Sequence, residues 1–112
     1  MLDVEIRVTP SATVAYLQGV ADTTTCGQLL ATLTNLVSSR PARIVVVMDA
    51  LDFIDSWGIG ALVRAFHIAN DLKLPFYTVS QQSHIRRVLQ ITGLDRIIPL
   101  CRTEQAALSL GT

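Results

Sequence analysis

The sequence predicts one α/β domain, because short apolar runs of strand length alternate with longer segments whose apolar residues recur at helical spacing. The most apolar run, residues 44–48, is rich in β-branched side chains, which indicates a strand buried on both faces of a sheet. The length of 112 residues is typical of a compact domain with its own core. We therefore expect residues 1–112 to form one domain.

The first third of the chain predicts a β-hairpin followed by a helix. Apolar and charged residues alternate over residues 4–8, residues 9–12 have the composition of a turn, and residues 13–17 form a second strand-like run. A connection this short favours antiparallel pairing. Asp22 and the three threonines after it provide capping groups for a helix that ends at Ser-Arg-Pro, residues 39–41. The apolar stripe of this helix contains Leu29, Leu30, Leu33, Leu36 and Val37.

The strand at residues 44–48 precedes the longest amphipathic segment of the chain. The apolar stripe of that segment contains Ile59, Leu62, Val63, Phe66 and Ala69. The change from strand to helix period falls between Asp55 and Gly58. This position makes Ser56 the predicted N-cap, with its hydroxyl accepting a hydrogen bond from a backbone N–H group.

The last part of the chain predicts a strand at residues 76–79, a helix after the polar residues 80–83, and a short strand at residues 97–100. Gly93 is expected to end this helix, as glycine commonly does after a last helical turn. Thr103 is expected to begin a closing helix. The predicted apolar face of the closing helix is Ala106, Ala107 and Leu110.

Ser56 is the predicted functional centre, because its hydroxyl lies where the most apolar strand meets the longest helix. Gly58 and Gly60 leave the first helical turn without side-chain bulk, which favours close approach by another molecule. Free N–H groups and the helix dipole favour added negative charge at such a terminus, so the segment is suited to carry a phosphate on Ser56. Most serines in this position only cap a helix, which is the alternative interpretation.

Three segments, in this order, resemble the STAS domains of bacterial anti-sigma factor antagonists. Residues 44–60 are similar to the family's apolar strand, aspartate, short apolar link and Asp-Ser-x-Gly start of a helix. Residues 17–22, Leu-Gln-Gly-Val-Ala-Asp, and residues 83–95, which contain Thr-Gly-Leu, are similar to two further motifs. One departure is Trp57, where the family often has serine or another small residue. Its side chain either packs on the domain surface or anchors a partner, because tryptophan is enriched at binding hot spots.

The resemblance implies a STAS-type fold, with a mixed sheet of about four to five strands flanked by about four helices. It also implies a partner switch, in which the unphosphorylated protein binds an anti-sigma factor with serine kinase activity and so releases a sigma factor. Phosphorylation of Ser56 by that kinase would end the binding, and a serine phosphatase would restore it. The expected neighbours of the phosphorylation site, which would also contact the partner, are Asp22, Asp55, Trp57, Gly58 and Gly60.

Composition and charge disfavour several other classes of protein. Nine basic and nine acidic side chains balance, so direct binding to nucleic acid is not expected. No apolar stretch reaches the roughly 18 residues of a membrane span, and the N-terminus lacks a signal-peptide pattern. We therefore expect a cytoplasmic protein that does not bind membranes. Two cysteines are too few for a disulfide framework or a structural zinc site, and no metal or cofactor is expected.

Three alternatives to the partner switch require different features of the sequence. A serine hydrolase would need a glycine two residues before Ser56, and this glycine is absent. It would also need a histidine base, but His67 lies within a predicted helix beside its apolar stripe and His84 begins another predicted helix in a polar run. A receiver domain phosphorylated on aspartate would need an acidic pair for magnesium after the first strand and a lysine after the last, and both are absent. We therefore predict that the chain is not an enzyme. The remaining alternative is a STAS binding or scaffold module of a stress-sensing or lipid-transport complex, without phosphorylation.

Overall fold

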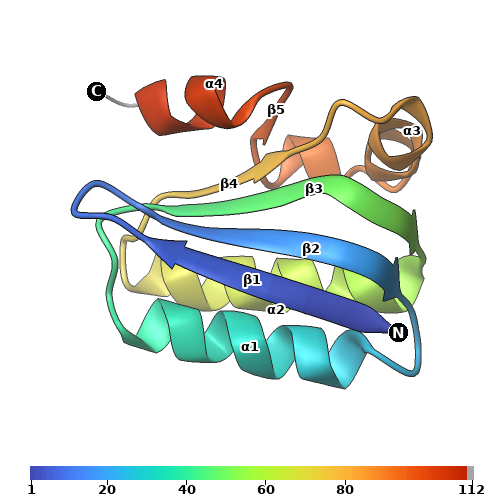
Figure 1. Ribbon diagram of the computed structural model, residues 1–112, viewed down its shortest axis with the longest axis horizontal. Coiled ribbons are helices and arrows are strands. Elements are labelled where there is room, and N and C mark those ends of the chain that lie inside the picture. The colour runs from blue at the N-terminus through green and yellow to red at the C-terminus, as the bar shows by residue number, and fades with distance from the viewer. Residues whose placement is uncertain (111–112) are drawn as a thin grey trace.

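The computed structural model describes residues 1–110. Strands and helices alternate along this part of the chain, as the sequence predicts (Figure 1). The strands are β1 (Leu2–Val8), β2 (Thr13–Ala21), β3 (Ile44–Ile54), β4 (Phe76–Val79) and β5 (Leu100–Cys101). The helices are α1 (Cys26–Ser38), α2 (Ser56–Asp71), α3 (Ser83–Ile91) and α4 (Glu104–Ser109), with a short 3-10 helix, η1 (Leu94–Arg96), between α3 and β5.

The strands form one five-stranded sheet in the order β1-β2-β3-β4-β5. β1 pairs with β2 antiparallel, and the other neighbours pair parallel, which confirms the predicted hairpin and the mixed sheet. Helices α1 and α2 lie side by side against one face of the sheet, and α4 lies on the other face over β3 and β4 (Figure 1). Helix α3 packs against β3 and η1. The domain is therefore a layered α/β fold.

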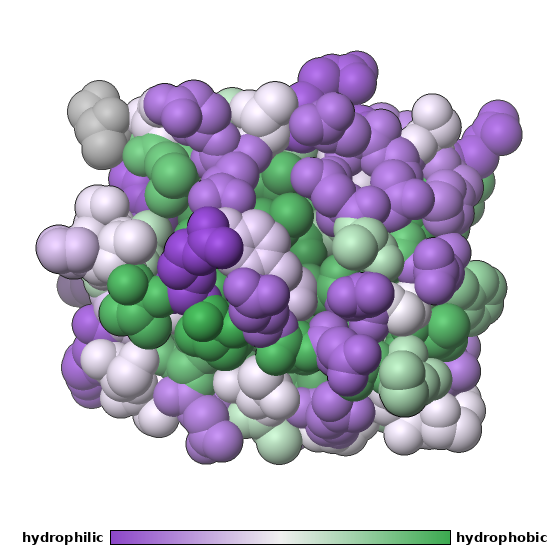
Figure 2. Space-filling view, in the orientation of Figure 1, coloured by the Kyte–Doolittle hydropathy of each residue, from purple (hydrophilic) through white to green (hydrophobic). Residues whose placement is uncertain are grey.

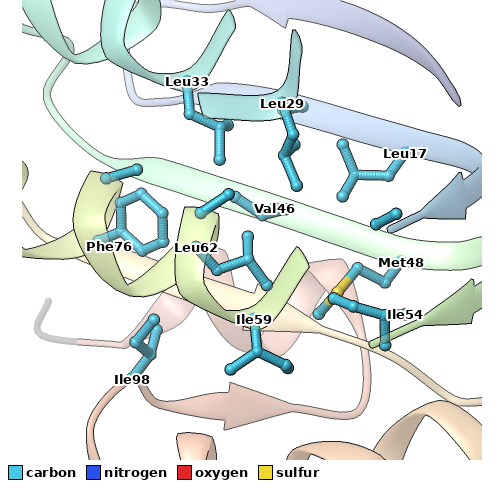
Figure 3. Close-up of a cluster of buried hydrophobic side chains, with 14 of the residues drawn as sticks. Leu17, Leu29, Leu33, Val46, Met48, Ile54, Ile59, Leu62, Phe76 and Ile98 are labelled. Atoms are coloured by element: carbon cyan, nitrogen blue, oxygen red, sulfur yellow. The ribbon is translucent and has the colours of Figure 1, made fainter. Parts of the chain in front are cut away.

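The apolar run in β3 contributes to the core on both of its faces, as predicted. Ile44, Val46 and Met48 belong to the large cluster that includes α1 and α2, part of which Figure 3 shows between the helices and the sheet. Val45 and Val47 belong to a smaller cluster that includes Ala107 of α4. Since successive side chains of a strand point to opposite faces, this run needs helices on both sides.

β2 and β3 continue beyond the runs that predicted them, so the predicted strand ends were wrong. The two strands stay paired as far as Ala21 and Ile54, with register shifts between Tyr16 and Gln18 and between Gly19 and Val20. Such irregularities interrupt the alternation of buried and exposed side chains from which a strand is predicted in a sequence. The extension matters for function, because it brings the end of β2 to the start of α2.

The predicted end of α3 is confirmed, but the strand predicted after it begins too early. Gly93 follows the helix in the left-handed conformation, with a φ of +79°. Ile97 is 45% exposed rather than in the sheet. Ile98 is buried, and its N–H donates to the Leu94 carbonyl at 2.8 Å in a turn. The backbone hydrogen bonds from Ile97 and Ile98 to Leu94 of η1 thus hold these two residues in a turn, although their apolar character predicted a strand.

The closing helix begins as predicted but has a narrower buried face. The Thr103 hydroxyl accepts a hydrogen bond from the N–H of Ala106 at 3.1 Å, which confirms the cap. Ala107 is fully buried, whereas Ala106 is exposed and Leu110 is 40% exposed. The reason is that α4 has only six residues, so one turn contacts the sheet.

Candidate functional site

The first turn of α2 is capped by Asp55 and not, as predicted, by Ser56. Asp55 has extended backbone angles, and its Oδ1 accepts hydrogen bonds from the N–H groups of Trp57 at 2.9 Å and Gly58 at 3.3 Å. Ser56 is the first residue of the helix itself. Both residue types are good caps, and a carboxylate also complements the positive end of the helix dipole. Two N–H groups that were expected to be free for a phosphate are therefore already bonded to Asp55.

Ser56 is exposed and does not cap the helix. Its hydroxyl makes no hydrogen bond with residues 1–110, so a reaction at its oxygen would break no contact in this part of the protein. The following residue, Trp57, is also exposed, with 60% of its surface accessible. Much of this residue is thus accessible to a partner, as the interpretation of Trp57 as an anchor requires.

The start of α2 is held close to the end of β2. The N–H of Asp55 donates to the carbonyl of Ala21 at 3.1 Å. A Cβ atom added at Gly58 would lie 2.7 Å from that same carbonyl oxygen and 2.8 Å from Cγ1 of Ile54. Gly58 is buried, so its missing side chain lets the helix approach its own sheet rather than giving space to another molecule. At Gly60, by contrast, an added Cβ would have no atom within 4 Å.

Asp22 lies at the same end of the sheet as Asp55. The parallel pair Ala21 and Ile54 is the last of the β2–β3 ladder, and the two aspartates are the next residue of each chain segment. The Oδ1 atom of Asp22 accepts hydrogen bonds from the hydroxyl of Thr24 at 2.7 Å and from its N–H at 2.9 Å. These bonds, the hydroxyl bond first, lower the pKa of Asp22 below its usual value. Asp22 therefore contributes an ionised carboxylate to this end of the sheet at neutral pH.

A groove runs between α1 and the first turns of α2, beside Ser56. It has a volume of about 650 Å³ and is lined by apolar side chains that include Leu30 from α1 and Trp57, Ile59 and Val63 from α2. Ser56 and Gly60 also line this groove. An apolar groove beside an exposed hydroxyl can bind a partner side chain, and a modification of the hydroxyl would then affect that binding. The spacing of apolar residues within one helix could not predict this groove, because α1 and α2 form it together.

Sequence analysis also missed Phe53, which is 50% exposed three residues before Ser56. Phe53 lies beyond the strand predicted at residues 44–48, in the short apolar link before Ser56. It is exposed because the irregular end of β3 turns it outward while Leu51 and Ile54 face the core. Two exposed aromatic side chains therefore lie near Ser56 in the sequence, and such side chains are enriched where proteins bind each other.

The segment that leads to Ser56 is held by two residues at the start of α3, Gln82 and His84. The Gln82 side chain donates to the carbonyls of Met48 at 3.1 Å and Leu51 at 2.7 Å. The His84 ring bonds to the carbonyl of Asp52 at 3.0 Å. His84 is thus a structural contact of this segment. These bonds hold the second half of β3, and with it the start of α2, in one position.

Within residues 1–110 no cluster of three or more His, Cys, Asp or Glu side chains is arranged to hold a metal ion. In the same range no helix has the length and apolar character needed to cross a membrane. The candidate site consists of the Ser56 hydroxyl, Asp55, Asp22 at the same end of the sheet, the exposed Trp57 and the groove.

The profile of the STAS domain matches residues 3–107. The chain belongs to the STAS domain family. Among curated proteins it is similar to a putative anti-sigma factor antagonist, BtrV, of Bordetella bronchiseptica, with 28% identity over 94 residues that make up 84% of this chain and 81% of that protein. The family accounts for the mixed sheet of this α/β domain.

Solved STAS structures share the fold over nearly the whole chain. A crystal structure of an anti-sigma factor antagonist from Mycobacterium paratuberculosis is 25% identical, covers 97% of this chain and 92% of its own, and has a TM-score of 0.87. The Bacillus cell fate determinant SpoIIAA in its phosphorylated form is 22% identical, covers 96% of each chain, and has a TM-score of 0.70. At 22% identity, the similarity to SpoIIAA shows a shared fold and nothing about function.

Proposed function

We propose that this chain acts as one STAS domain and is an anti-sigma factor antagonist of the bacterial cytoplasm, controlled by phosphorylation of Ser56. The observation that carries the proposal is the exposed, unbonded hydroxyl of Ser56 at the start of α2, directly beside the apolar groove. Support also comes from the relative BtrV and the Mycobacterium paratuberculosis structure, both described as anti-sigma factor antagonists. The protein is then a regulator and the substrate of other enzymes, and is not itself an enzyme.

In the unphosphorylated state, an anti-sigma factor with serine kinase activity binds around Ser56. The exposed ring of Trp57 is 60% accessible and forms part of the groove wall, so it can serve as an aromatic anchor in the interface. Binding to this surface keeps the anti-sigma factor from holding its sigma factor. The sigma factor is thereby released.

Phosphorylation changes the charge of this surface rather than its fold. A phosphate adds about 1.5 to 2 negative charges at pH 7. At Ser56 it would lie next to the Asp55 carboxylate, which already accepts two N–H bonds of the helix end, and near Asp22. A partner surface shaped for a small neutral hydroxyl would meet a bulky dianion among carboxylates, at a cost of about a few kcal/mol. Binding is lost until a serine phosphatase removes the phosphate.

Binding measurements with two Ser56 variants test the proposal. Ser56→Ala should bind the purified anti-sigma factor kinase of the host permanently, and Ser56→Asp should bind it at least tenfold more weakly. The fold is expected to tolerate both changes, because the side chain is exposed and Asp55 caps the helix. Equal binding by the two variants would rule out the switch.

Peptide mass spectrometry of the protein from its host, during growth and after stress, provides a second test. Trypsin should release residues 44–64, in which Ser56 is the only Ser, Thr or Tyr. A phosphate on this peptide therefore needs no further localisation. Its amount should change with conditions if the switch operates.

The second candidate function is a STAS binding or scaffold module without phosphorylation, in a stress-sensing or lipid-transport complex. The observation that favours it is the bulk of Trp57 next to Ser56, which narrows the approach of a kinase to the hydroxyl. In this case no phosphate would be found on residues 44–64 under any condition. Ser56→Ala would then leave partner binding unchanged, whereas Trp57→Ala would weaken it.

A further inference from the structure

β1 is an edge strand with unpaired backbone groups on its outer side. Among the described residues 1–110, it pairs only with β2. The bonds from Thr9 N to Ala12 O and from Val20 N to Met1 O, both 2.8 Å, show that odd-numbered residues of this strand bond to β2. Val4, Ile6 and Val8 therefore direct their N–H and C=O groups outward, because these directions alternate along a strand. The outward carbonyl of Leu2 is already bonded by the Gln28 side chain at 2.8 Å.

On the α1 side of the sheet, the exposed side chains of this edge are apolar, whereas Asp3, Glu5 and Arg7 on the opposite face are charged. Ile6 is 41% exposed and Val8 is 73% exposed. Figure 2 shows apolar groups gathered along the face toward the viewer, where β1 lies in Figure 1. Natural edge strands are usually protected against pairing by charges, proline or a covering segment. Here the nearest proline, Pro10, lies after the strand.

The helix beneath this edge carries no charge. None of the thirteen residues of α1 is charged, although the exposed face of a surface helix is normally rich in charged residues. The contact from Gln28 to Leu2 places that side chain next to the edge. Ala31 and Asn35 follow Gln28 at helical spacing and are exposed. A second molecule approaching this side would therefore meet no like charge from α1.

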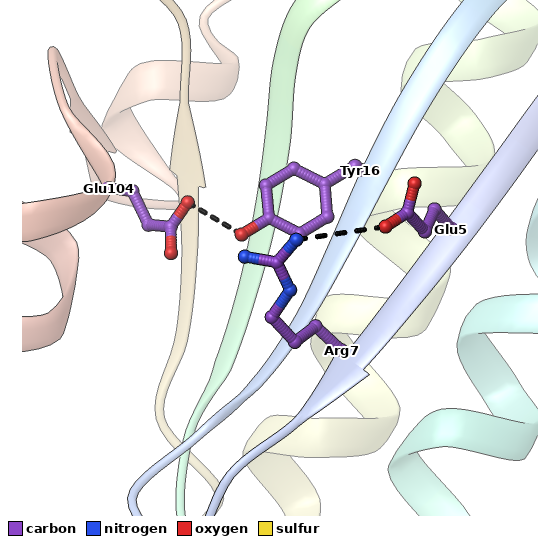
Figure 4. Close-up of polar contacts among 4 residues, drawn as sticks. All are labelled: Glu5, Arg7, Tyr16 and Glu104. Carbon is purple, nitrogen blue, oxygen red and sulfur yellow. Dashed lines mark hydrogen bonds and ion pairs between the residues drawn. The ribbon is translucent and has the colours of Figure 1, made fainter.

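The two charges near the middle of the strand have opposite sign and are separated by one residue. Glu5 and Arg7 lie on the sheet face opposite to α1, together with Tyr16 (Figure 4). Their own contact is 3.8 Å long, and their side chains are 73% and 62% exposed. A surface pair of this kind contributes little stability within one chain. Both side chains remain accessible to a second molecule.

We propose that two copies of this chain pair through their β1 strands, antiparallel, about a twofold axis at Ile6. The outward groups of Ile6 then bond to Ile6 of the second copy, and those of Val4 bond to Val8 in both directions, giving about six backbone hydrogen bonds. Glu5 lies opposite Arg7 of the second copy, and Arg7 lies opposite Glu5. The two five-stranded sheets become one continuous sheet.

The charges and the occupied Leu2 carbonyl favour this register over its neighbour. An axis at Glu5 would pair Val4 with Ile6 but would place Val8 opposite Leu2, whose carbonyl is already bonded to Gln28. It would place Asp3 opposite Arg7, but it would also place the two Glu5 side chains opposite each other, and like charges directly opposite are destabilising. The axis at Ile6 instead gives two favourable cross-strand pairs on one face and apolar contacts on the other. The overlap ends before Leu2, whose carbonyl is occupied, and before Pro10, which has no N–H to donate.

A charge exchange tests the proposal with the full chain. Glu5→Arg would place arginine opposite Arg7 of the second copy, and Arg7→Glu would place glutamate opposite Glu5, so each single variant should sediment as a monomer. The double variant Glu5→Arg/Arg7→Glu restores both opposite-charge pairs and should regain the dimer. Sedimentation velocity over a concentration series, from about 10 to 500 µM, measures the state of each protein. Thermal melting shows whether each variant is folded.

A parent protein that is monomeric throughout this series would overturn the proposal. The same conclusion follows if the parent dimerises and all three variants dimerise equally, because another surface would then be responsible. Failure of the double variant to recover dimerisation, when each single variant is a folded monomer, would overturn the register at Ile6. Recovery by the double variant supports both the surface and the register. The outcome is independent of phosphorylation at Ser56.

Discussion

Replacing Gly58 with alanine tests how closely α2 approaches the end of β2. The added Cβ would lie 2.7 Å from the Ala21 carbonyl oxygen, 2.8 Å from Cγ1 of Ile54 and 2.9 Å from Cβ of Ala21. The Ile54 side chain can move, but the Ala21 carbonyl is backbone and also accepts the hydrogen bond from Asp55. The helix must therefore shift, or that bond must lengthen.

The expected cost follows from two opposing effects. Overpacking of a buried site costs about 1 to 3 kcal/mol, and the backbone contact places Gly58→Ala near the upper value. Alanine is better than glycine in a helix by about 1 kcal/mol. The net loss should be about 2 kcal/mol, which lowers the midpoint of urea unfolding by about 1 M for a protein of this size.

Gly60→Ala is the matched control, because it makes the same change two residues further along the same helix. No atom lies within 4 Å of the added Cβ at that position, so only the gain in helix propensity remains. Its urea midpoint should equal or exceed that of the parent. Our reasoning would be refuted if Gly58→Ala unfolded at the parent midpoint, or if the control were destabilised as much.

Three further predictions concern the cap, an alkaline titration and the groove. Asp55→Ala removes the acceptor of two N–H groups and should lower the free energy of unfolding in urea by about 1 to 2 kcal/mol, whereas an unchanged midpoint would contradict the assigned cap. The Tyr16 hydroxyl donates to Glu104 at 2.7 Å (Figure 4), and burial, followed by this bond, raises the pKa of Tyr16 above 10. Folding favours the neutral phenol, so the contribution of Tyr16 to stability is complete below about pH 10 and is lost as the pH rises through the folded pKa. Tyr16→Phe should therefore reduce the alkaline loss of stability measured by urea unfolding from pH 8 to 11. Identical pH profiles of the two proteins would show that Tyr16 does not cause this loss. Trp57→Ala should weaken binding to the anti-sigma factor kinase at least tenfold by calorimetry while leaving the urea midpoint unchanged, and unaltered affinity would remove Trp57 from the interface.

The parts of the fold that sequence analysis predicted are those with local signals. The hairpin followed from a short connection between two strand-like runs, and α1 and α2 followed from their apolar stripes. The missed parts depend on contacts between distant segments. The register shifts that extend β2 and β3 arise from their mutual pairing, and no residue pattern within either strand marks them.

The same distinction applies to the site. Ser56 and its neighbours could be found because an isolated hydroxyl followed by two glycines is visible in the sequence. The cap was assigned one residue too late, because serine and aspartate both cap helices and the choice depends on backbone angles. The role of Gly58 was misjudged for a similar reason, since only the fold brings Ala21 next to it. The groove and the exposure of Phe53 likewise depend on how separate segments meet.

If Ser56 is phosphorylated as proposed above, the contacts around it would let the phosphate change binding without refolding the domain. The backbone before Ser56 is bonded to Gln82 and His84, Asp55 caps α2, and Gly58 packs on the end of β2. The Ser56 hydroxyl takes no part in these interactions, so a phosphate there breaks none of them. The negative charge of the phosphate would instead weaken the binding of a partner at the groove. The phosphorylated and unphosphorylated proteins should therefore unfold at similar urea concentrations but differ greatly in affinity for the partner, whereas a switch based on refolding would change both together.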